Sequence, residues 1–294
     1  MKILFTGASG RLGSRLVPAV HGLGIRCGLL LRPISRLSDE VLALNNLSIL
    51  RASSEYEVIN FVKSFDPDVI VHTACNYGLN GESYEEICSV NIDLGLTLIH
   101  SLSLIKAKKI FININTALPS NVSPYAKSKH YFSKICEEFS EKSSGNFQYI
   151  DLITHIIYGH SLTNEDFISK TINRCLDNVK DLNLTSGFQK SDFIHIDDVV
   201  KAIVLIISKI GDIEQSVRYE LGSGIGRTIK EVVKLIHSLT NSQSNLCFGA
   251  LAYRISEPVN LIADNAKLRQ LGWLPTTNFE EKIKEMIHGR IENK

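Results

Sequence analysis

The residues of this chain with the clearest chemistry are a tyrosine and a lysine, Tyr125 and Lys129, four positions apart. On a helix, this spacing places both side chains on one face. A tyrosine hydroxyl has an ordinary pKa of about 10, so it exchanges protons poorly at neutral pH unless a nearby cation lowers that value. Lys129 is such a cation. The pair could therefore give a proton to a carbonyl group or take one from an alcohol.

A glycine-rich turn near the start of the chain could hold a dinucleotide. It reads Gly7-Ala8-Ser9-Gly10-Arg11-Leu12-Gly13 and directly follows an apolar run at 3–5. Gly7 permits a tight turn, Gly10 lets the backbone approach a phosphate, and Gly13 permits close packing of a helix on a strand. Free N–H groups at the start of that helix attract a pyrophosphate. We assign to cofactor binding the residues Gly7, Ser9, Gly10, Arg11, Leu12 and Gly13.

Arginines after the second predicted strand bear on which dinucleotide binds. NAD enzymes of this kind usually carry an acidic residue there, which takes the ribose 2′-hydroxyl. This chain has Arg32, with Arg36 nearby and Arg11 in the glycine turn. Because guanidinium groups bind a phosphate well, the pattern favours NADP(H) over NAD(H). Three exposed surface arginines are the alternative interpretation.

The composition excludes several classes of partner. The 294 residues allow one large domain or two smaller ones, and the apolar (44%) and charged (21%) fractions are those of a globular protein. A net charge of +1 gives no electrostatic reason to bind nucleic acid or a membrane surface. No apolar run approaches the roughly 18 residues that span a bilayer. Cysteines and histidines lack metal-ligand spacing. We expect a cytoplasmic protein with reduced cysteines, no metal site and no signal peptide.

Strand-like and helix-like segments alternate along the first half, and they must position these residues. The predicted strands are 3–6, 26–31, 47–50, 68–72, 109–114 and 147–153, and the predicted helices are 12–23, 57–65, 83–106 and 123–142. Such alternation predicts a doubly wound parallel sheet of the Rossmann type, followed by a smaller C-terminal α/β part. We expect the NADP-binding domain over 1–158, with 192–210 returning to it, and a second domain over 159–191 and 211–294.

Beyond the two motifs, three further segments carry a resemblance to a known family. They are Val90-Asn91 in the helix 83–106, the run Phe193-Ile194-His195-Ile196-Asp197-Asp198-Val199, and Leu271-Gly272-Trp273-Leu274-Pro275. With them the chain resembles, over nearly its whole length, the extended short-chain dehydrogenase/reductases that act on nucleotide sugars. This resemblance implies that 159–191 and 211–294 form a nucleotide-sugar-binding domain. In length and simplicity it is similar to 4-ketoreductases of the CDP-abequose and CDP-paratose synthase type in O-antigen synthesis.

The resemblance implies roles for individual residues. Thr116 would hydrogen-bond the substrate carbonyl, Tyr125 would exchange the proton, and Lys129 would also hold the cofactor ribose. Ala74 would contact the cofactor and Asn91 would be structural. Arg254 and Glu257 match the R-x-x-[DE] pattern that binds the nucleotide of the substrate, although a surface salt bridge would give the same pattern.

The sequence also departs from that family. Thr116 and Tyr125 are only 125 − 116 = 9 positions apart, which is a shorter loop than relatives have and should leave the site more open. Arg51-Ala52-Ser53 stands where relatives often place an Asp that contacts adenine. The family's common arginine is missing around 151–154.

The residues after Thr116 select among the family's reactions. Dehydratases follow their Thr with Asp-Glu, whereas Ala117-Leu118 cannot exchange a proton. Epimerase-reductases place a Cys there, and it too is absent. The pattern favours NADPH-dependent reduction of the C4 ketone of a nucleotide-linked 4-keto-6-deoxy or 3,6-dideoxy sugar. An NAD-dependent 4-epimerase and a non-catalytic NADP(H)-sensing or scaffold protein remain alternatives. A homodimer through the helices that contain Asn91 and Tyr125 is expected.

Overall fold

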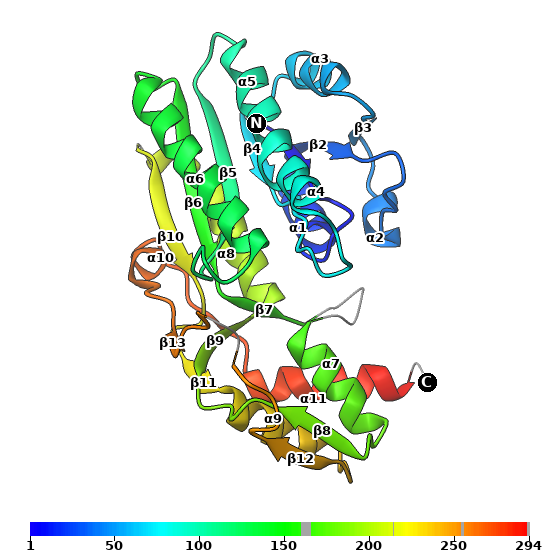
Figure 1. Ribbon diagram of the computed structural model, residues 1–294. Coiled ribbons are helices and arrows are strands. Elements are labelled where there is room, and N and C mark those ends of the chain that lie inside the picture. The colour runs from blue at the N-terminus through cyan, green and yellow to red at the C-terminus, as the bar shows by residue number, and fades with distance from the viewer. Residues whose placement is uncertain (160–165, 214, 254–255, 293–294) are drawn as a thin grey trace. The chain divides into compact units, whose positions relative to one another are not determined.

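The chain folds into two compact units. The computed structural model describes residues 1–159, 166–213, 215–253 and 256–292 (Figure 1). Unit 1 comprises Met1–Ile153 and Ile203–Tyr219, and unit 2 comprises Thr154–Ala202 and Glu220–Lys294. The first break therefore falls five residues before the expected boundary at 158, and the returning segment is 203–219 rather than 192–210. In this division the second half of one helix and the first three residues of the strand at 217–221 belong to unit 1.

A seven-stranded sheet forms the centre of unit 1, in the order β10-β6-β5-β4-β1-β2-β3. Its strands are β1 (Lys2–Thr6), β2 (Arg26–Leu31), β3 (Ser48–Arg51), β4 (Val69–His72), β5 (Lys109–Thr116), β6 (Phe147–Thr154) and β10 (Val217–Leu221). The pairs from β3 to β5 are all parallel. Every residue of β4 is buried, as expected for a strand covered on both faces. The predicted doubly wound sheet is confirmed.

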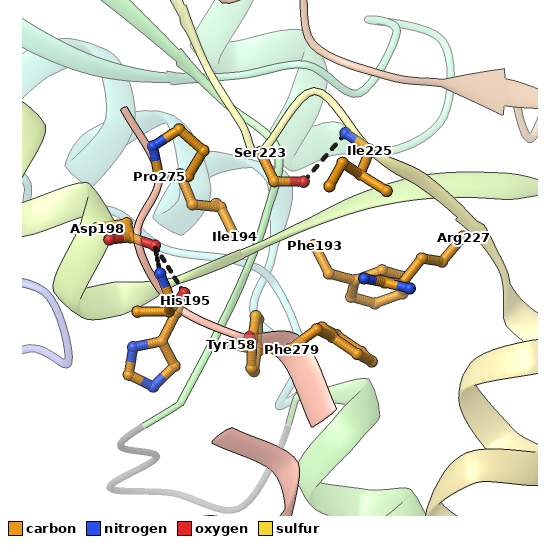
Figure 2. A pocket seen from close by; sticks show the side chains of 11 residues that line it. Tyr158, Phe193, Ile194, His195, Asp198, Ser223, Ile225, Arg227, Pro275 and Phe279 are labelled. Atoms are coloured by element: carbon orange, nitrogen blue, oxygen red, sulfur yellow. Dashed lines mark hydrogen bonds between the residues drawn. The ribbon is translucent and has the colours of Figure 1, made fainter. Parts of the chain in front are cut away.

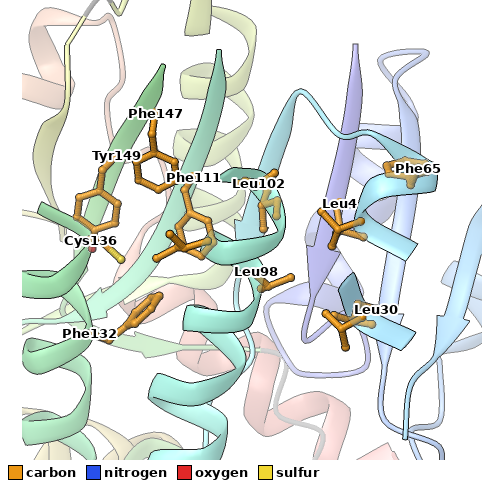
Figure 3. Close-up of a cluster of buried hydrophobic side chains, with 14 residues drawn as sticks. Leu4, Leu30, Phe65, Leu98, Leu102, Phe111, Phe132, Cys136, Phe147 and Tyr149 are labelled. Carbon is orange, nitrogen blue, oxygen red and sulfur yellow. The ribbon is translucent and has the colours of Figure 1, made fainter. Parts of the chain in front are cut away.

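Helices cover both faces of this sheet (Figure 1). They are α1 (Gly13–His21), α2 (Asp39–Leu42), α3 (Glu55–Phe65), α4 (Tyr84–Cys88), the π-helical stretch η1 (Ser89–Asp93), α5 (Leu94–Ser103), α6 (Pro124–Lys142), the second half of α8 (Ile196–Ser208) and the short 3₁₀ turn η2 (Ile210–Asp212). One apolar core joins α3, α5 and α6 to the sheet through Leu4, Phe111, Phe132 and Phe147 (Figure 3).

The helix predicted over 83–106 is interrupted in the structure. It runs as α4, then η1, then α5, so five residues around Asn91 are π-helical. A π-bulge adds one residue to a turn and is frequent at functional sites. Here it contains the buried side chain of Asn91, whose partners lie outside its own helix.

Unit 2 is built around two small sheets. In the first, β9 (Lys190–His195) pairs with β7 (Ile156–Tyr158), β11 (Gly226–Thr228) and β13 (Asn260–Leu261); in the second, β8 (Asp181–Leu184) pairs with β12 (Asn245–Phe248). Its remaining helices are α7 (Phe167–Leu176), α9 (Ile229–Leu239), α10 (Ala266–Gln270) and α11 (Phe279–Glu292). Apolar residues of α7, α9 and α11 pack together in its core. Most strands of this unit were not expected from the sequence.

Candidate active site

The glycine turn between β1 and α1 is too tight for side chains. Gly7 has a φ of +69°, and a Cβ atom there would lie 2.6 Å from the backbone nitrogen of Ala74. A Cβ on Gly13 would collide with the carbonyl oxygen of Gly7 and lie 2.7 Å from Ala8 Cα. No acidic residue or side-chain cap stands at the start of α1. The N–H groups of this helix start therefore suit a pyrophosphate, which is what a dinucleotide cofactor requires.

An arginine that the sequence analysis did not assign shapes the loop after β2. Nη1 of Arg51, at the end of β3, donates hydrogen bonds to the carbonyl oxygens of Arg32, Pro33 and Ser35, at 3.5, 3.2 and 2.6 Å. The loop that carries the exposed Arg32 and Arg36 is thus fixed by a third arginine. In the sequence, only its place directly after the predicted strand 47–50 could have indicated this role.

The end of β5 and the start of α6 bring Thr116 and Tyr125 together despite the short loop between them. Ser123 caps α6 by accepting the N–H of Ala126 at 3.1 Å, and Pro124 occupies the first turn, where its missing N–H costs nothing. Tyr125 therefore lies in that first turn, and its side chain makes a hydrogen bond with Thr116.

Burial dominates the electrostatics of the tyrosine and lysine. Burial raises the pKa of Tyr125, Cys75 raises it further, and the hydrogen bond with Thr116 lowers it. The pKa of Lys129 is lowered by burial and raised by Cys75, Asp151 and Cys136. The lowering of the Tyr125 pKa that we expected from Lys129 is not among these effects. Instead, Lys129 Nζ donates to Asn113 Oδ1 at 3.4 Å.

The segment after β4 adds two residues that the sequence analysis missed. The rings of Tyr77 and Tyr125 are 4.8 Å apart between centroids. Burial raises the pKa of the Cys75 thiol, whereas Lys129, a hydrogen bond to Tyr77 and Arg11 lower it. Arg11 of the glycine turn and Lys129 of α6 thus both act on one thiol, so the predicted cofactor and catalytic residues lie near each other.

Ala74 and Asn91 hold this segment in place. The Ala74 N–H donates to Thr6 Oγ1 at 3.2 Å, which places it beside the glycine turn. Asn91 accepts the N–H of Asn76 at 2.7 Å and donates to the Asn76 carbonyl and to Ser128 Oγ, both at 2.9 Å. Asn91 therefore connects the segment after β4 to the helix that carries Tyr125.

The predicted substrate residues of unit 2 are only partly described. Arg254 lies outside the described residues. Glu257 is half-buried and accepts a hydrogen bond from Gln189 Nε2 at 3.2 Å. The side chain of Glu257 is thus oriented toward β9.

A small pocket in unit 2 lies among the family's signature segments (Figure 2). It has a volume of about 40 Å³. Its lining includes Tyr158, His195, Asp198, Arg227 and Phe279. Ligand pockets usually enclose roughly 300–1,000 Å³. The pocket is therefore too small for a nucleotide sugar and marks a junction of packed structural segments.

The described parts of the chain show neither a cluster of metal-ligand side chains nor a membrane-spanning helix. No group of three or more His, Cys, Asp and Glu side chains there could hold a metal ion. No helix described there is both long and apolar enough to cross a membrane.

Comparisons with known proteins agree with this architecture. A sequence model described as "NAD dependent epimerase/dehydratase family" matches residues 3–222. CDP-abequose synthase from Salmonella muenchen is 29% identical over 97% of both chains, and the one from Salmonella typhimurium is 25% identical over 97% of both. The structure is similar to UDP-glucose 4-epimerase from Thermotoga maritima (TM-score 0.84, 20% identity, 100% and 99% coverage). It is also similar to dTDP-glucose 4,6-dehydratase from Streptomyces venezuelae (TM-score 0.84, 17% identity, 100% and 98% coverage).

Proposed function

Since the chain belongs to the NAD dependent epimerase/dehydratase family, we propose that it reduces the C4 ketone of a nucleotide-linked 4-keto-6-deoxy or 3,6-dideoxy sugar with NADPH. It is an NAD(P)-dependent oxidoreductase of the extended short-chain dehydrogenase/reductase family. Both relatives described above are CDP-abequose synthases, so a CDP-linked sugar is the first substrate to test.

Residues of unit 1 suit the cofactor. Gly7, Gly10 and Gly13 with the start of α1 would hold the pyrophosphate. The other assigned residues of the turn, Ser9, Arg11 and Leu12, and Ala74 beside it would also contact the cofactor. When bound, a nicotinamide cofactor would supply the hydride. Arg32 and Arg36, on the loop held by Arg51, would bind a 2′-phosphate, which supports NADPH over NADH.

The side chains at the ends of β5 and α6 suit a reduction. A ketone that gains a hydride needs a proton on its oxygen, and burial raises the pKa of Tyr125 and so keeps its hydroxyl protonated at neutral pH. Thr116, which contacts Tyr125, would donate a hydrogen bond to the same oxygen. Lys129 would hold the cofactor ribose.

One observation favours reduction over dehydration. After Thr116 the chain continues with Ala117 and Leu118, and the Leu118 N–H donates to Thr116 Oγ1 at 3.2 Å. Neither side chain can act as an acid or a base, so this turn offers no group to remove a proton from the sugar ring or to protonate a leaving hydroxyl. Reduction needs only the Thr116, Tyr125 and Lys129 side chains.

The substrate's nucleotide would bind in unit 2, where we assign Glu257, with Arg254, to recognition of its phosphate and ribose.

We also infer a homodimer through α5 and α6. Apolar side chains of α4, α5 and α6 are exposed, among them Tyr84, Leu96, Tyr131 and Ile135. A second copy of the chain would cover them.

The test is the oxidation of NADPH, followed by its near-ultraviolet absorbance, with CDP-, TDP- and GDP-linked 4-keto-6-deoxy sugars. Oxidation with one sugar that is abolished by Tyr125→Phe supports the proposal. Interconversion of two nucleotide sugars without net cofactor consumption would instead identify a 4-epimerase. Tight NADPH binding with no conversion of any sugar would point to a cofactor-sensing protein.

A further inference from the structure

A buried carboxylate lies next to β5, the strand that ends at Thr116. Asp151, on β6, is only 1% exposed. Its Oδ1 accepts hydrogen bonds from Asn113 Nδ2 at 3.1 Å and from the Tyr149 hydroxyl at 2.8 Å. Its Oδ2 accepts from Asn115 Nδ2 at 3.0 Å and from Ser133 Oγ at 2.7 Å. Four uncharged donors thus converge on one carboxylate inside the sheet.

The two asparagines extend this network to the catalytic residues. Asn113 and Asn115 are two positions apart on β5, so both side chains lie on the same face of the strand. Asn115 Oδ1 accepts the backbone N–H of Thr116 at 2.8 Å, and Asn113 Oδ1 accepts Lys129 Nζ at 3.4 Å. A carboxylate only accepts hydrogen bonds, so it requires the NH₂ of each amide to face it. Each amide oxygen is thereby directed toward Thr116 or Lys129.

Asp151 also places a negative charge among buried residues, one of which is Lys129. Lys129 is 1% exposed. The titratable groups that interact with it are His72 on β4, Cys75 after β4, Cys136 on α6 and Asp151 on β6. Asp151 is the one carboxylate among these groups, as far as the described residues go. A buried ammonium is strongly disfavoured unless an opposite charge lies close by.

We propose that Asp151 is a positioning residue for the reduction proposed above: it orients the amides of Asn113 and Asn115 toward Lys129 and Thr116, and it keeps Lys129 an ammonium. The inference rests on that proposed function. Arg218 Nε, 3.5 Å from Oδ2, shares the charge of Asp151 but lies on a largely exposed side chain. Asp151 also raises the pKa of Lys129 through its charge.

A merely structural role is the competing explanation, and unit 2 contains a matched control for it. Asp198 is also 1% exposed, and its carboxylate accepts four hydrogen bonds from the backbone and hydroxyl groups of Thr276 and Thr277. Its ion pair is with Lys201, on its own helix. Replacing either aspartate by asparagine removes a buried charge, but only Asp151 has Lys129 as a neighbour.

The experiment compares Asp151→Asn with Asp198→Asn, each with its unfolding free energy measured. For Asp151→Asn we expect kcat to fall by roughly 10- to 100-fold, with KM changed little, and the alkaline limb of the kcat–pH profile to move to lower pH. The sign follows because loss of the negative charge disfavours the ammonium form of Lys129, so Lys129 loses its proton at a lower pH. Asp198→Asn should leave the limb where it is.

A second readout does not depend on turnover. In protein with ¹³C-labelled lysine, the Cε signal of Lys129, assigned with Lys129→Met, should titrate at lower pH in Asp151→Asn than in wild type. If wild type reduces no sugar, the proposed function fails, while this titration still tests Asp151. An unchanged Lys129 titration overturns the inference. If Asp151→Asn does not fold, Asn113→Ala tests the same connection, and an unaltered kcat in that folded variant also overturns it.

Discussion

A hydrogen bond of 2.9 Å joins Asn91 Nδ2 to Ser128 Oγ, two side chains 37 positions apart on different helices. Ser128 Oγ in turn donates to the carbonyl oxygen of Tyr125 at 2.8 Å. The π-helical stretch η1 is therefore connected to the first turn of α6, where the proposed proton donor lies. The same amide of Asn91 holds both backbone groups of Asn76.

Asn91→Ala should lower the free energy of unfolding by about 2–3 kcal/mol, because it removes three hydrogen bonds and leaves the partly buried backbone N–H and carbonyl of Asn76 without their partner. It should also lower kcat, because the backbone at Tyr125 loses its connection to η1. Urea unfolding and steady-state kinetics measure the two effects. Asn80→Ala is the matched control, since its amide bonds only Glu82 in an exposed loop. Equal effects of the two variants would contradict the structural role of Asn91.

Arg32→Ala should raise the Kd of NADPH by roughly 10- to 100-fold, the range for a hydrogen-bonded ion pair, and should leave the Kd of NADH nearly unchanged. Fluorescence titration with each cofactor measures this. Arg26→Ala removes an exposed arginine from the other end of β2 and should change neither Kd. An equal loss of affinity for both cofactors would show that Arg32 does not read the 2′-phosphate.

His72 should make unit 1 less stable in acid. Burial, followed by the nearby charge of Lys129, lowers the pKa of His72 to about 3. Between about pH 6.5, its ordinary pKa, and the lowered pKa, the imidazole of His72 binds a proton in the unfolded state but not in the folded state. The free energy of unfolding therefore falls as the pH falls. From this group the loss between about pH 7 and about pH 5 is about 2 kcal/mol.

The check is urea unfolding at those two pH values for wild type and His72→Phe, whose ring would lie beside Phe111 and Phe132. The variant should lose less stability on acidification. His288→Phe, at an exposed position, should keep the slope of wild type. If His72→Phe also keeps that slope, His72 is not the group responsible.

Ile135→Glu combined with Tyr131→Glu should convert a dimer to a monomer, because both side chains are exposed on α6 and a carboxylate there would be buried in the proposed interface. Light scattering coupled to gel filtration measures the mass. Tyr56→Glu, on the exposed face of α3, is the control and should leave the mass unchanged. A wild-type protein that is monomeric at every concentration would rule out the interface.

Regular patterns made the sheet of unit 1 predictable. Strands buried on both faces are continuous apolar runs, and the glycines at 7, 10 and 13 identify the first turn because no side chain fits there. Tyr125 and Lys129 could be paired because a helix relates residues four apart. The predicted roles of these residues in binding and catalysis stay predictions.

Contacts between distant strands could not be predicted in the same way. Asn113, Asn115 and Asp151 are polar residues in otherwise apolar strands, and that anomaly was the available signal. Their convergence depends on β5 and β6 being neighbours in the sheet. Arg51 likewise gains its role only because the loop after β2 folds back over the end of β3. In unit 2, strands of two to six residues were too short for a period to show.

The order of strands in unit 1 has a consequence for how the chain is made. β10 lies at the edge of the sheet next to β6, yet residues 154–202 of unit 2 are synthesised between these two strands. Until β10 emerges from the ribosome, the unpaired edge of β6, an almost wholly buried strand, is open to other chains. Nascent protein should therefore need protection at that edge, and a gene fragment that stops before residue 217 should aggregate even though it encodes the glycine turn and every proposed catalytic residue.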